Sequence, residues 1–330
     1  MPSWAEILAE INETAVERGL LGPDFDGVRQ KYLAELHALT GRAVISYASG
    51  WLNGKGGFQE TAVTGEDVHG FMQVCHGVEE RELDLIIHSP GGDPQAAEQI
   101  VEYLRTQFDS IRCFVPLQAK SAATMIALGC DEIFMGHHSE LGPIDPQIQM
   151  SSADGVRSGP AHGILRDFQR AQRETAQNVN LLPAWTPILR SYVGGMIEYC
   201  TQAVNLSMDL VEGWLNRYML THPDYAFADD AARAARAREI AEYFGSNESY
   251  DRFRAHGRPI RMPELRDTLN LRVTPLGDDD VLQDAVLSIF HATAITFNGP
   301  ATKIIENHLG SKWAKVQQAI MLQIPQPQPG

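Results

Sequence analysis

The stretch Leu83-Asp-Leu-Ile-Ile-His-Ser-Pro-Gly-Gly92 is a short buried-strand run that ends in a turn with two consecutive glycines. A helical pattern follows over 94–108, with apolar residues on one face, and a second strand run covers 111–115. A helix of small apolar residues over 121–128 then leads to a third strand run at 132–135. Strands that alternate with helices in this order predict an α/β fold with a parallel sheet and right-handed crossovers.

Helical patterns dominate the chain outside this stretch. They cover most of the first 40 residues, before a strand run over 42–48, and later 163–180, 186–220, 229–243 and 281–297. The small and polar segment 146–162 predicts a mobile loop. We therefore expect five parts: an N-terminal helical extension (1–41), a core (42–180), a helical insertion (181–248), the end of the core with C-terminal helices (249–324) and a disordered tail (325–330).

Composition and charge exclude several classes of protein. A formal net charge of -15 repels a phosphate backbone, so we do not expect nucleic-acid binding. The four cysteines are scattered and form no C-x-x-C pair, which argues against a disulfide framework or a zinc site and favours a reducing cytoplasm. No run approaches the roughly 18 apolar residues of a membrane span, and the acidic first residues do not resemble a secretory signal. We expect a cytoplasmic protein without a transmembrane segment.

Two elements of the α/β stretch could carry chemistry. Gly91 and Gly92 let the backbone turn tightly and leave N–H groups free to bind a ligand, although a plain strand-to-helix turn would look the same. Ser121 stands at the start of a helix, where a serine often serves only as an N-cap. Both elements follow strands of one parallel sheet, and ligands collect at the carboxyl ends of such strands.

A third element, His137-His-Ser-Glu-Leu-Gly-Pro-Ile-Asp145, follows the third strand and adds histidines and carboxylates at the same edge. Two adjacent histidines point to opposite sides of an extended chain, so we expect structural histidines here and no metal site. No G-x-G-x-x-G follows a strand, so no nicotinamide cofactor is expected, and we expect no other cofactor.

Three motifs together resemble the serine dehydrogenase proteinase family over about residues 83–150. They are S-P-G-G, A-K-S-A-A-T-x-I-A-L-G-C-D-E-I and S-E-L-G-P-I-D-P-Q. This family is a branch of the Clp-protease/crotonase superfamily and is related to the signal-peptide-peptidase-A type enzymes. A weaker similarity to the end of the superfamily core begins at Ala255-His-Gly-Arg-Pro-Ile. The resemblance implies a repeated ββα spiral core with a parallel sheet, to which N-terminal and C-terminal helices are added.

The resemblance also implies a Ser–His–Asp triad, and the matching positions are Ser121, His256 and Asp145. His256 would take the proton of the serine hydroxyl, and Asp145 would fix the tautomer of the imidazole. The amides of Gly91 or Gly92, with that of Ala122, would form the oxyanion hole. From its polar, Arg-rich surroundings alone, His256 would be read as a surface residue.

Related enzymes also use a Ser–Lys dyad, and Lys120 directly precedes the serine. Adjacent residues on a turn rarely face each other, so we do not expect Lys120 to be the base. The sequence thus predicts a serine peptidase acting on peptides or proteins. A catalytically silent scaffold and an acyl-thioester enzyme of the same fold are the alternatives. The superfamily mostly assembles as trimers, hexamers or rings, so we also expect a homo-oligomer, with contacts through the 163–180 helix and the 186–220 helix. The alternative is that the apolar residues of the 186–220 helix pack within the core of the subunit.

Overall fold

The computed structural model describes residues 3–54, 57–152 and 155–317. Its centre is a seven-stranded sheet in the order β10-β5-β3-β2-β1-β11-β12. The first five of these strands run parallel, and the last two are antiparallel to their neighbours. The strands are β1 (Ala43–Ser49), β2 (Glu82–His88), β3 (Ser110–Val115), β5 (Glu132–Met135), β10 (Val273–Pro275), β11 (Ala301–Asn307) and β12 (Lys312–Val316).

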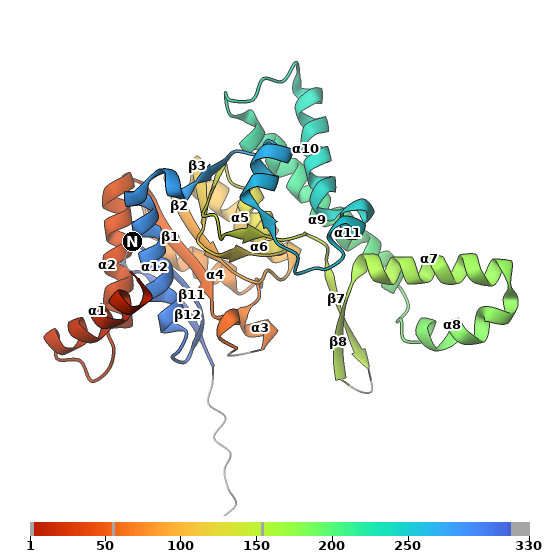
Figure 1. Ribbon diagram of the computed structural model, residues 1–330, viewed down its shortest axis with the longest axis horizontal. Helices are drawn as coiled ribbons and strands as arrows, with labels where there is room; N and C mark the ends of the chain where they lie inside the picture. The colour runs from red at the N-terminus through yellow and green to blue at the C-terminus, as the bar shows by residue number, and fades with distance from the viewer. Residues whose placement is uncertain (1–2, 55–56, 153–154, 318–330) are drawn as a thin grey trace, which may run out of the picture.

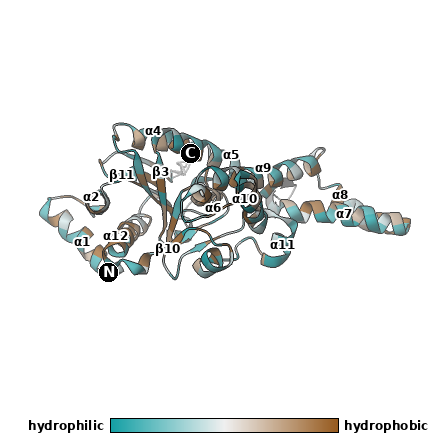
Figure 2. Cartoon of the chain, turned by 90° about the horizontal axis from the view of Figure 1, so that it is seen from above, coloured by the Kyte–Doolittle hydropathy of each residue, from teal (hydrophilic) through white to brown (hydrophobic). Residues whose placement is uncertain are grey.

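Helices cover both faces of this sheet (Figures 1 and 2). The crossover helices α4 (Asp67–Cys75), α5 (Pro94–Gln107) and α6 (Ala122–Leu128) pack on one face. The helices α1 (Trp4–Glu17), α2 (Phe25–Thr40) and α12 (Asp280–Thr296) pack on the other. Successive strand residues point to opposite faces, and Ile45 and Val44 accordingly lie in the two separate apolar clusters. The sheet is buried on both sides, as parallel strands require.

The helix after the double-glycine turn begins where the sequence signals a start. Asp93 accepts a hydrogen bond from the amide of Gln95 as the N-cap of α5, and Pro94 occupies the first helical position. Proline is favoured there because its missing N–H would have no partner within the helix. This start places the turn directly at the carboxyl end of β2.

Two small sheets lie beside the central one. The first contains β4 (Gln118–Ala119), β6 (Glu140–Leu141) and β9 (Ile260–Arg261), so it brings three distant parts of the chain together. The second is a hairpin of β7 (Gln147–Ser152) and β8 (Gly155–Pro160). Shorter elements are α3 (Phe58–Thr61), the 3-10 turns Trp51–Asn53, Val179–Leu181, Met219–Thr221 and Leu276–Asp278, and a π turn at Glu264–Thr268.

The remaining helices extend from the α4–α6 side (Figure 1). α9 (Met196–Arg217) packs against α5, α6 and α10 (Asp230–Gly245), and α11 (Asn247–Phe253) follows. α7 (Ala161–Gln177) and α8 (Leu182–Leu189) project away from the body as an arm. Among the described residues, no helix combines the length and the apolar character that crossing a membrane demands.

The α/β fold with a mostly parallel sheet and added helices is confirmed, and the elements of 83–135 lie where the patterns predict them. Three features differ. The helical pattern over 186–220 is two helices with a turn at Gly194 and Gly195 between them. The segment 146–162, expected as a loop, contains the β7–β8 hairpin. β11 and β12 follow the last helix, in a stretch for which no strand was predicted. The predicted disordered tail (325–330) lies outside the described residues.

Candidate active site

Ser121 lies between β4 and α6 with backbone angles of φ 49° and ψ -117°. A positive φ is rare for a residue with a side chain, and such strain persists only where the surroundings impose it. Ser121 occupies the N-cap position of α6, yet its side chain makes no capping hydrogen bond. The simple reading of this serine as a capping residue therefore does not apply, and Ser121 lines a cleft instead.

The double-glycine turn packs directly against Ser121. Gly91 has φ 84°, and a Cβ built on it would lie 2.3 Å from the carbonyl oxygen of Lys120 and 2.7 Å from Cβ of Ser121. A Cβ on Gly92 would lie 2.3 Å from the carbonyl oxygen of Val63. Both positions thus exclude a side chain, because backbone atoms of other segments lie too close to them.

The predicted amide donors differ in what they already bind. The N–H of Gly91 donates to Oγ of Ser89 at 3.2 Å. The N–H groups of Gly92 and Ala122 donate to no group in the part of the chain that the structure describes. Ala122 is the first residue of α6, where an N–H has no carbonyl within the helix to bind. Gly92 and Ala122 are therefore the better placed pair for an anion beside Ser121.

His256 and Asp145 meet although no local pattern links them. Nδ1 of His256 lies 2.5 Å from Oδ1 of Asp145, and Nε2 of Gln147 lies 3.3 Å from the other carboxylate oxygen. Asp145 is buried, and the imidazole is about one-third exposed. A carboxylate accepts the proton on Nδ1, so the neutral ring keeps a lone pair on Nε2. That nitrogen is the one available as a base.

Ser121 and His256 line the same cleft, which has a volume of about 460 Å³. Its other walls come from the double-glycine turn, the segment 62–65, and Gln147 to Gln149 of β7. No hydrogen bond joins Ser121 to His256 among the described residues. Catalytic contacts are often long without substrate and tighten once it binds. The arrangement can supply a nucleophile, a base and two amide donors at one place.

Lys120 is turned away from this cleft. Its Nζ lies 2.7 Å from Oε1 of Glu140 and donates to the carbonyl of Leu141 at 3.2 Å. Burial lowers the pKa of Lys120, and the contact with Glu140 acts in the opposite direction. His138 is also bound elsewhere, because its Nε2 lies 2.9 Å from the carbonyl of Pro116. These residues support the strands around the cleft and do not line it.

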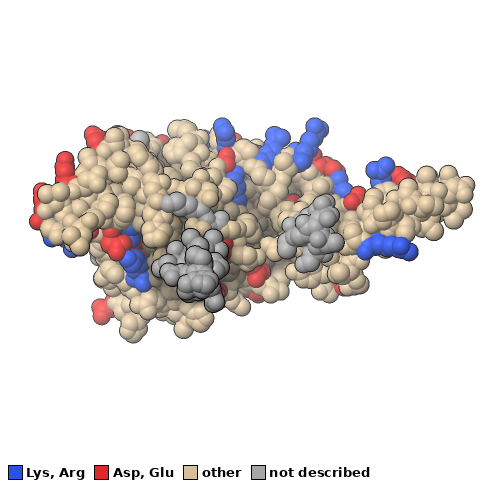
Figure 3. Space-filling model, turned by 90° about the horizontal axis from the view of Figure 1, so that it is seen from below, with Lys and Arg blue, Asp and Glu red and all other residues tan. Residues whose placement is uncertain are grey.

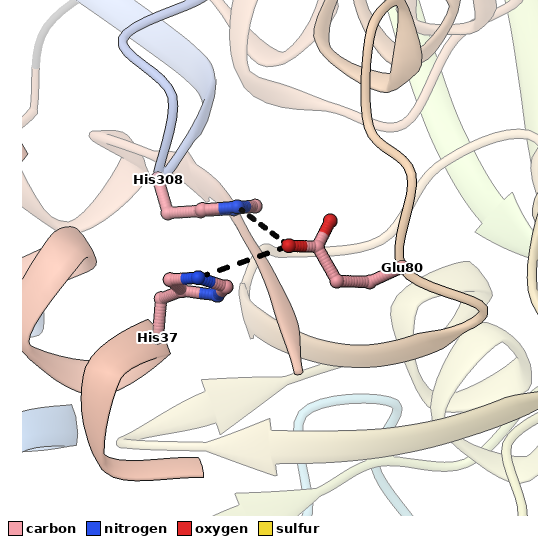
Figure 4. Close-up of side chains that lie close together, drawn as sticks. All are labelled: His37, Glu80 and His308. Atoms are coloured by element: carbon pink, nitrogen blue, oxygen red, sulfur yellow. Dashed lines mark ion pairs between the residues drawn. The ribbon is translucent and has the colours of Figure 1, made fainter. Parts of the chain in front are cut away.

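One group of side chains, His37, Glu80 and His308, has the composition of a metal site (Figure 4). Nε2 of each histidine lies 3.7 Å from Oε1 of Glu80, and the two rings stack. However, Nδ1 of His308 lies 3.4 Å from the carbonyl oxygen of Val44 but accepts the N–H of Val44 at the shorter distance of 3.1 Å, which favours the ring hydrogen on Nε2. Ligation would cost that hydrogen bond. The group lies at the amino ends of β1 and β2, whereas the cleft lies at the carboxyl ends of the strands.

Comparison with known proteins identifies the part of the chain that contains Ser121. Residues 64–182 match the model of the ClpP-like SDH-type serine proteinases. This segment is similar to that family. The resemblance read from the sequence motifs is therefore confirmed, and the proteinase segment includes Ser121 and Asp145, whereas His256 lies beyond it.

Two relatives are uncharacterized proteins of Methanocaldococcus jannaschii. One is 37% identical over 95 residues, which cover 28% of this chain and 33% of that protein. The other is 35% identical over 104 residues, which cover 32% of this chain and 33% of that protein. The chain thus matches about a third of the length of these relatives.

Two similar solved structures are both of a membrane-bound stomatin-specific protease, 1510-N. A serine-to-alanine mutant has 15% identity and a TM-score of 0.37, covering 64% of this chain and 74% of that one. A lysine-to-alanine mutant in complex with a substrate peptide has 17% identity and a TM-score of 0.31, covering 70% and 93%. Nothing about the substrate of this chain follows from similarity at that level.

Proposed function

We propose that this chain hydrolyses peptide bonds with Ser121 as nucleophile, His256 as general base and Asp145 as the residue that orients the base. The proteinase family of residues 64–182 supports the reaction class. The single observation that carries the assignment is the 2.5 Å contact between Asp145 and His256 at the cleft that Ser121 lines. A catalytically silent scaffold or an acyl-thioester enzyme of this fold would have no use for such a pair.

The reaction would follow from these positions. As Oγ of Ser121 attacks the substrate carbonyl, Nε2 of His256 takes the hydroxyl proton and Asp145 stabilises the resulting imidazolium. The oxyanion would accept hydrogen bonds from the amides of Gly92 and Ala122, which need not reorganise during the step. His256 would then protonate the leaving amine. In the second half of the reaction, His256 would take a proton from water as the water attacks the acyl group, and that proton would return to Oγ of Ser121.

The substrate would bind in an extended conformation along β7. Gln147, Ile148 and Gln149 of this strand line the cleft next to Ser121. Within the described parts of the chain, β8 is the one strand that pairs with β7, so a peptide can add to the other edge of β7 through main-chain hydrogen bonds. That mode of binding gives affinity with little side-chain specificity.

We further propose that the protein is a cytoplasmic homo-oligomer whose subunits meet through the α7–α8 arm. The arm exposes large apolar side chains, which are costly on an isolated subunit. Val179, Leu182 and Ile188 are 69%, 48% and 41% exposed. The end of the arm carries few charges in Figure 3, in keeping with an interface.

The proposed activity can be tested with a fluorophosphonate probe. Oγ of Ser121 would attack phosphorus, fluoride would leave, and the hydroxyl proton would pass to His256. We expect labelling of the wild-type protein at Ser121, no labelling of Ser121→Ala, and labelling slowed by about 100-fold or more in His256→Ala. Labelling of folded wild-type protein at another serine, or none at all, would contradict the proposal.

A further inference from the structure

A fully buried ion pair lies behind the double-glycine turn and has no place in the mechanism above. Nζ of Lys303 on β11 lies 2.7 Å and 2.8 Å from the two carboxylate oxygens of Asp67, at the start of α4. Both side chains are completely inaccessible to solvent. Removing two charges from water is expensive, so a pair of this kind is weak evidence for stability and needs another explanation.

The ion pair binds the backbone on both sides of Val63. Nζ of Lys303 also donates to the carbonyl of Ala62, and a carboxylate oxygen of Asp67 accepts the N–H of Thr64 at 2.9 Å. The ion pair therefore fixes the peptide groups before and after Val63. Few other contacts could hold an isolated backbone segment at one position as firmly as charge-assisted hydrogen bonds do.

Val63 in turn holds the double-glycine turn. Its N–H donates to the carbonyl of Gly91 at 2.9 Å, and its carbonyl accepts the N–H of Asp93 at 2.9 Å. These two bonds enclose Gly92, whose own N–H is left free for the proposed oxyanion. A shift of Val63 would thus move the Gly92 amide relative to Ser121.

A second connection runs through Tyr47 on β1. Its hydroxyl donates to Asp67 at 2.7 Å, and it also interacts with Ser89, whose Oγ accepts the N–H of Gly91. Burial and the Asp67 carboxylate hold the pKa of Tyr47 well above its usual value, so the phenol keeps its proton. The ion pair therefore reaches the turn from two sides, through Val63 and through Tyr47.

From these contacts we infer that Lys303 and Asp67 are positioning residues that set the Gly92 amide for the oxyanion. This inference rests on the proposed peptidase function and adds to it a part of the chain, β11, that lies far outside the family match. Because an oxyanion donor acts in the transition state, the loss of its alignment should slow the chemical step and leave ground-state binding nearly unchanged.

The test is the inactivation of the full-length protein by a fluorophosphonate, separated into the binding constant KI and the rate constant kinact. The double variant Asp67→Asn/Lys303→Met removes both charges together, since loss of one alone would leave the other buried without a partner. We expect kinact to fall by about tenfold or more and KI to change by less than about threefold. Tyr47→Phe, which keeps the ring, should lower kinact in the same direction and by less.

The matched control is the double variant Arg29→Met/Glu306→Gln. This ion pair is also buried and also uses β11, but it faces α2 and touches neither Val63 nor the turn. We expect it to alter thermal stability without altering kinact. The inference would be overturned if Tyr47→Phe and the folded Asp67→Asn/Lys303→Met variant both kept the wild-type kinact. If the double variant does not fold, the kinact of Tyr47→Phe alone decides. Failure of the wild-type protein to be labelled would instead refute the peptidase function itself.

Discussion

The imidazole of His256 and the carboxylate of Asp145 are 2.5 Å apart, although 111 positions separate them in the chain. His256 lies between α11 and β9, and Asp145 lies between β6 and β7. The two loops meet because β6 and β9 pair in the small sheet beside Ser121. The pairing of two short strands thus brings an acid and a base together at the cleft.

Replacing the acid tests this contact. Asp145→Asn should reduce hydrolysis or fluorophosphonate labelling by about 1,000-fold or more, because an amide favours the wrong tautomer of the imidazole. Circular dichroism should show an intact fold. Asp251→Asn removes an exposed carboxylate that pairs with Arg166 and serves as the control. If Asp145→Asn keeps wild-type turnover, Asp145 is not the orienting acid.

The backbone strain at Ser121 gives a prediction about stability. Ser121→Ala and Ser121→Gly should both lose at least about 1,000-fold in activity, since each lacks the nucleophile. Glycine tolerates φ 49° and ψ -117°, whereas alanine retains the strained Cβ. We expect the glycine variant to be more stable than the alanine variant by about 1 kcal/mol, measured by urea denaturation. Equal stability of the two variants would show that the conformation stores no strain.

Acid should destabilise the protein through His88. Burial lowers the pKa of this histidine to about 4, although its bond to the carbonyl of Gln118 opposes the shift. Because the folded-state pKa lies below that of the unfolded chain, the unfolded chain binds more protons between those two values. The stabilisation from His88 is therefore complete above about pH 6.5 and is lost as the pH falls towards about 4.

This effect can be measured with His88→Gln, which does not titrate. Across that pH interval, the free energy of unfolding should change with pH less steeply in the variant, by up to about 1.4 kcal/mol per pH unit. His137 is exposed, so His137→Gln provides the control substitution. An unchanged slope in His88→Gln would mean that other groups cause the acid sensitivity.

Peptide binding along β7 should appear in amide hydrogen exchange. A covalent serine inhibitor that carries a peptide should slow exchange over residues 147–149, because the edge of β7 gains main-chain hydrogen bonds. An inhibitor of the same reactivity without a peptide should have little effect there. If exchange in this strand is the same with both inhibitors, the substrate binds elsewhere in the cleft.

Assembly through the α7–α8 arm should be visible by light scattering. We expect a mass well above the 36.5 kDa of one chain at micromolar concentration. Leu182→Glu/Ile188→Glu should shift the protein towards the monomer, because charges at an apolar contact cost more than they do in water. A wild-type monomer under these conditions would refute assembly.

The sequence by itself determined the α/β stretch from β2 to β5 and the positions of Ser121 and the double glycine. These features depend on local rules: apolar runs predict buried strands, and glycines mark turns that a side chain would block. The motif resemblance also pointed to Asp145 and His256, but only the pairing of β6 with β9 places them in contact.

The tertiary structure alone decided the place of β11 and the role of Lys303. The run Ala301-Thr-Lys-Ile-Ile-Glu-Asn307 has no continuous apolar pattern, because Lys303 and Glu306 interrupt it, and no strand was expected there. Both charges are buried in the sheet, where α4 supplies Asp67 to the lysine and α2 supplies Arg29 to the glutamate. A buried charge is tolerable only with its partner, and those partners lie more than 200 residues away in the sequence. Local pattern therefore could not assign this strand, since its stability depends on contacts that exist only after the chain has folded.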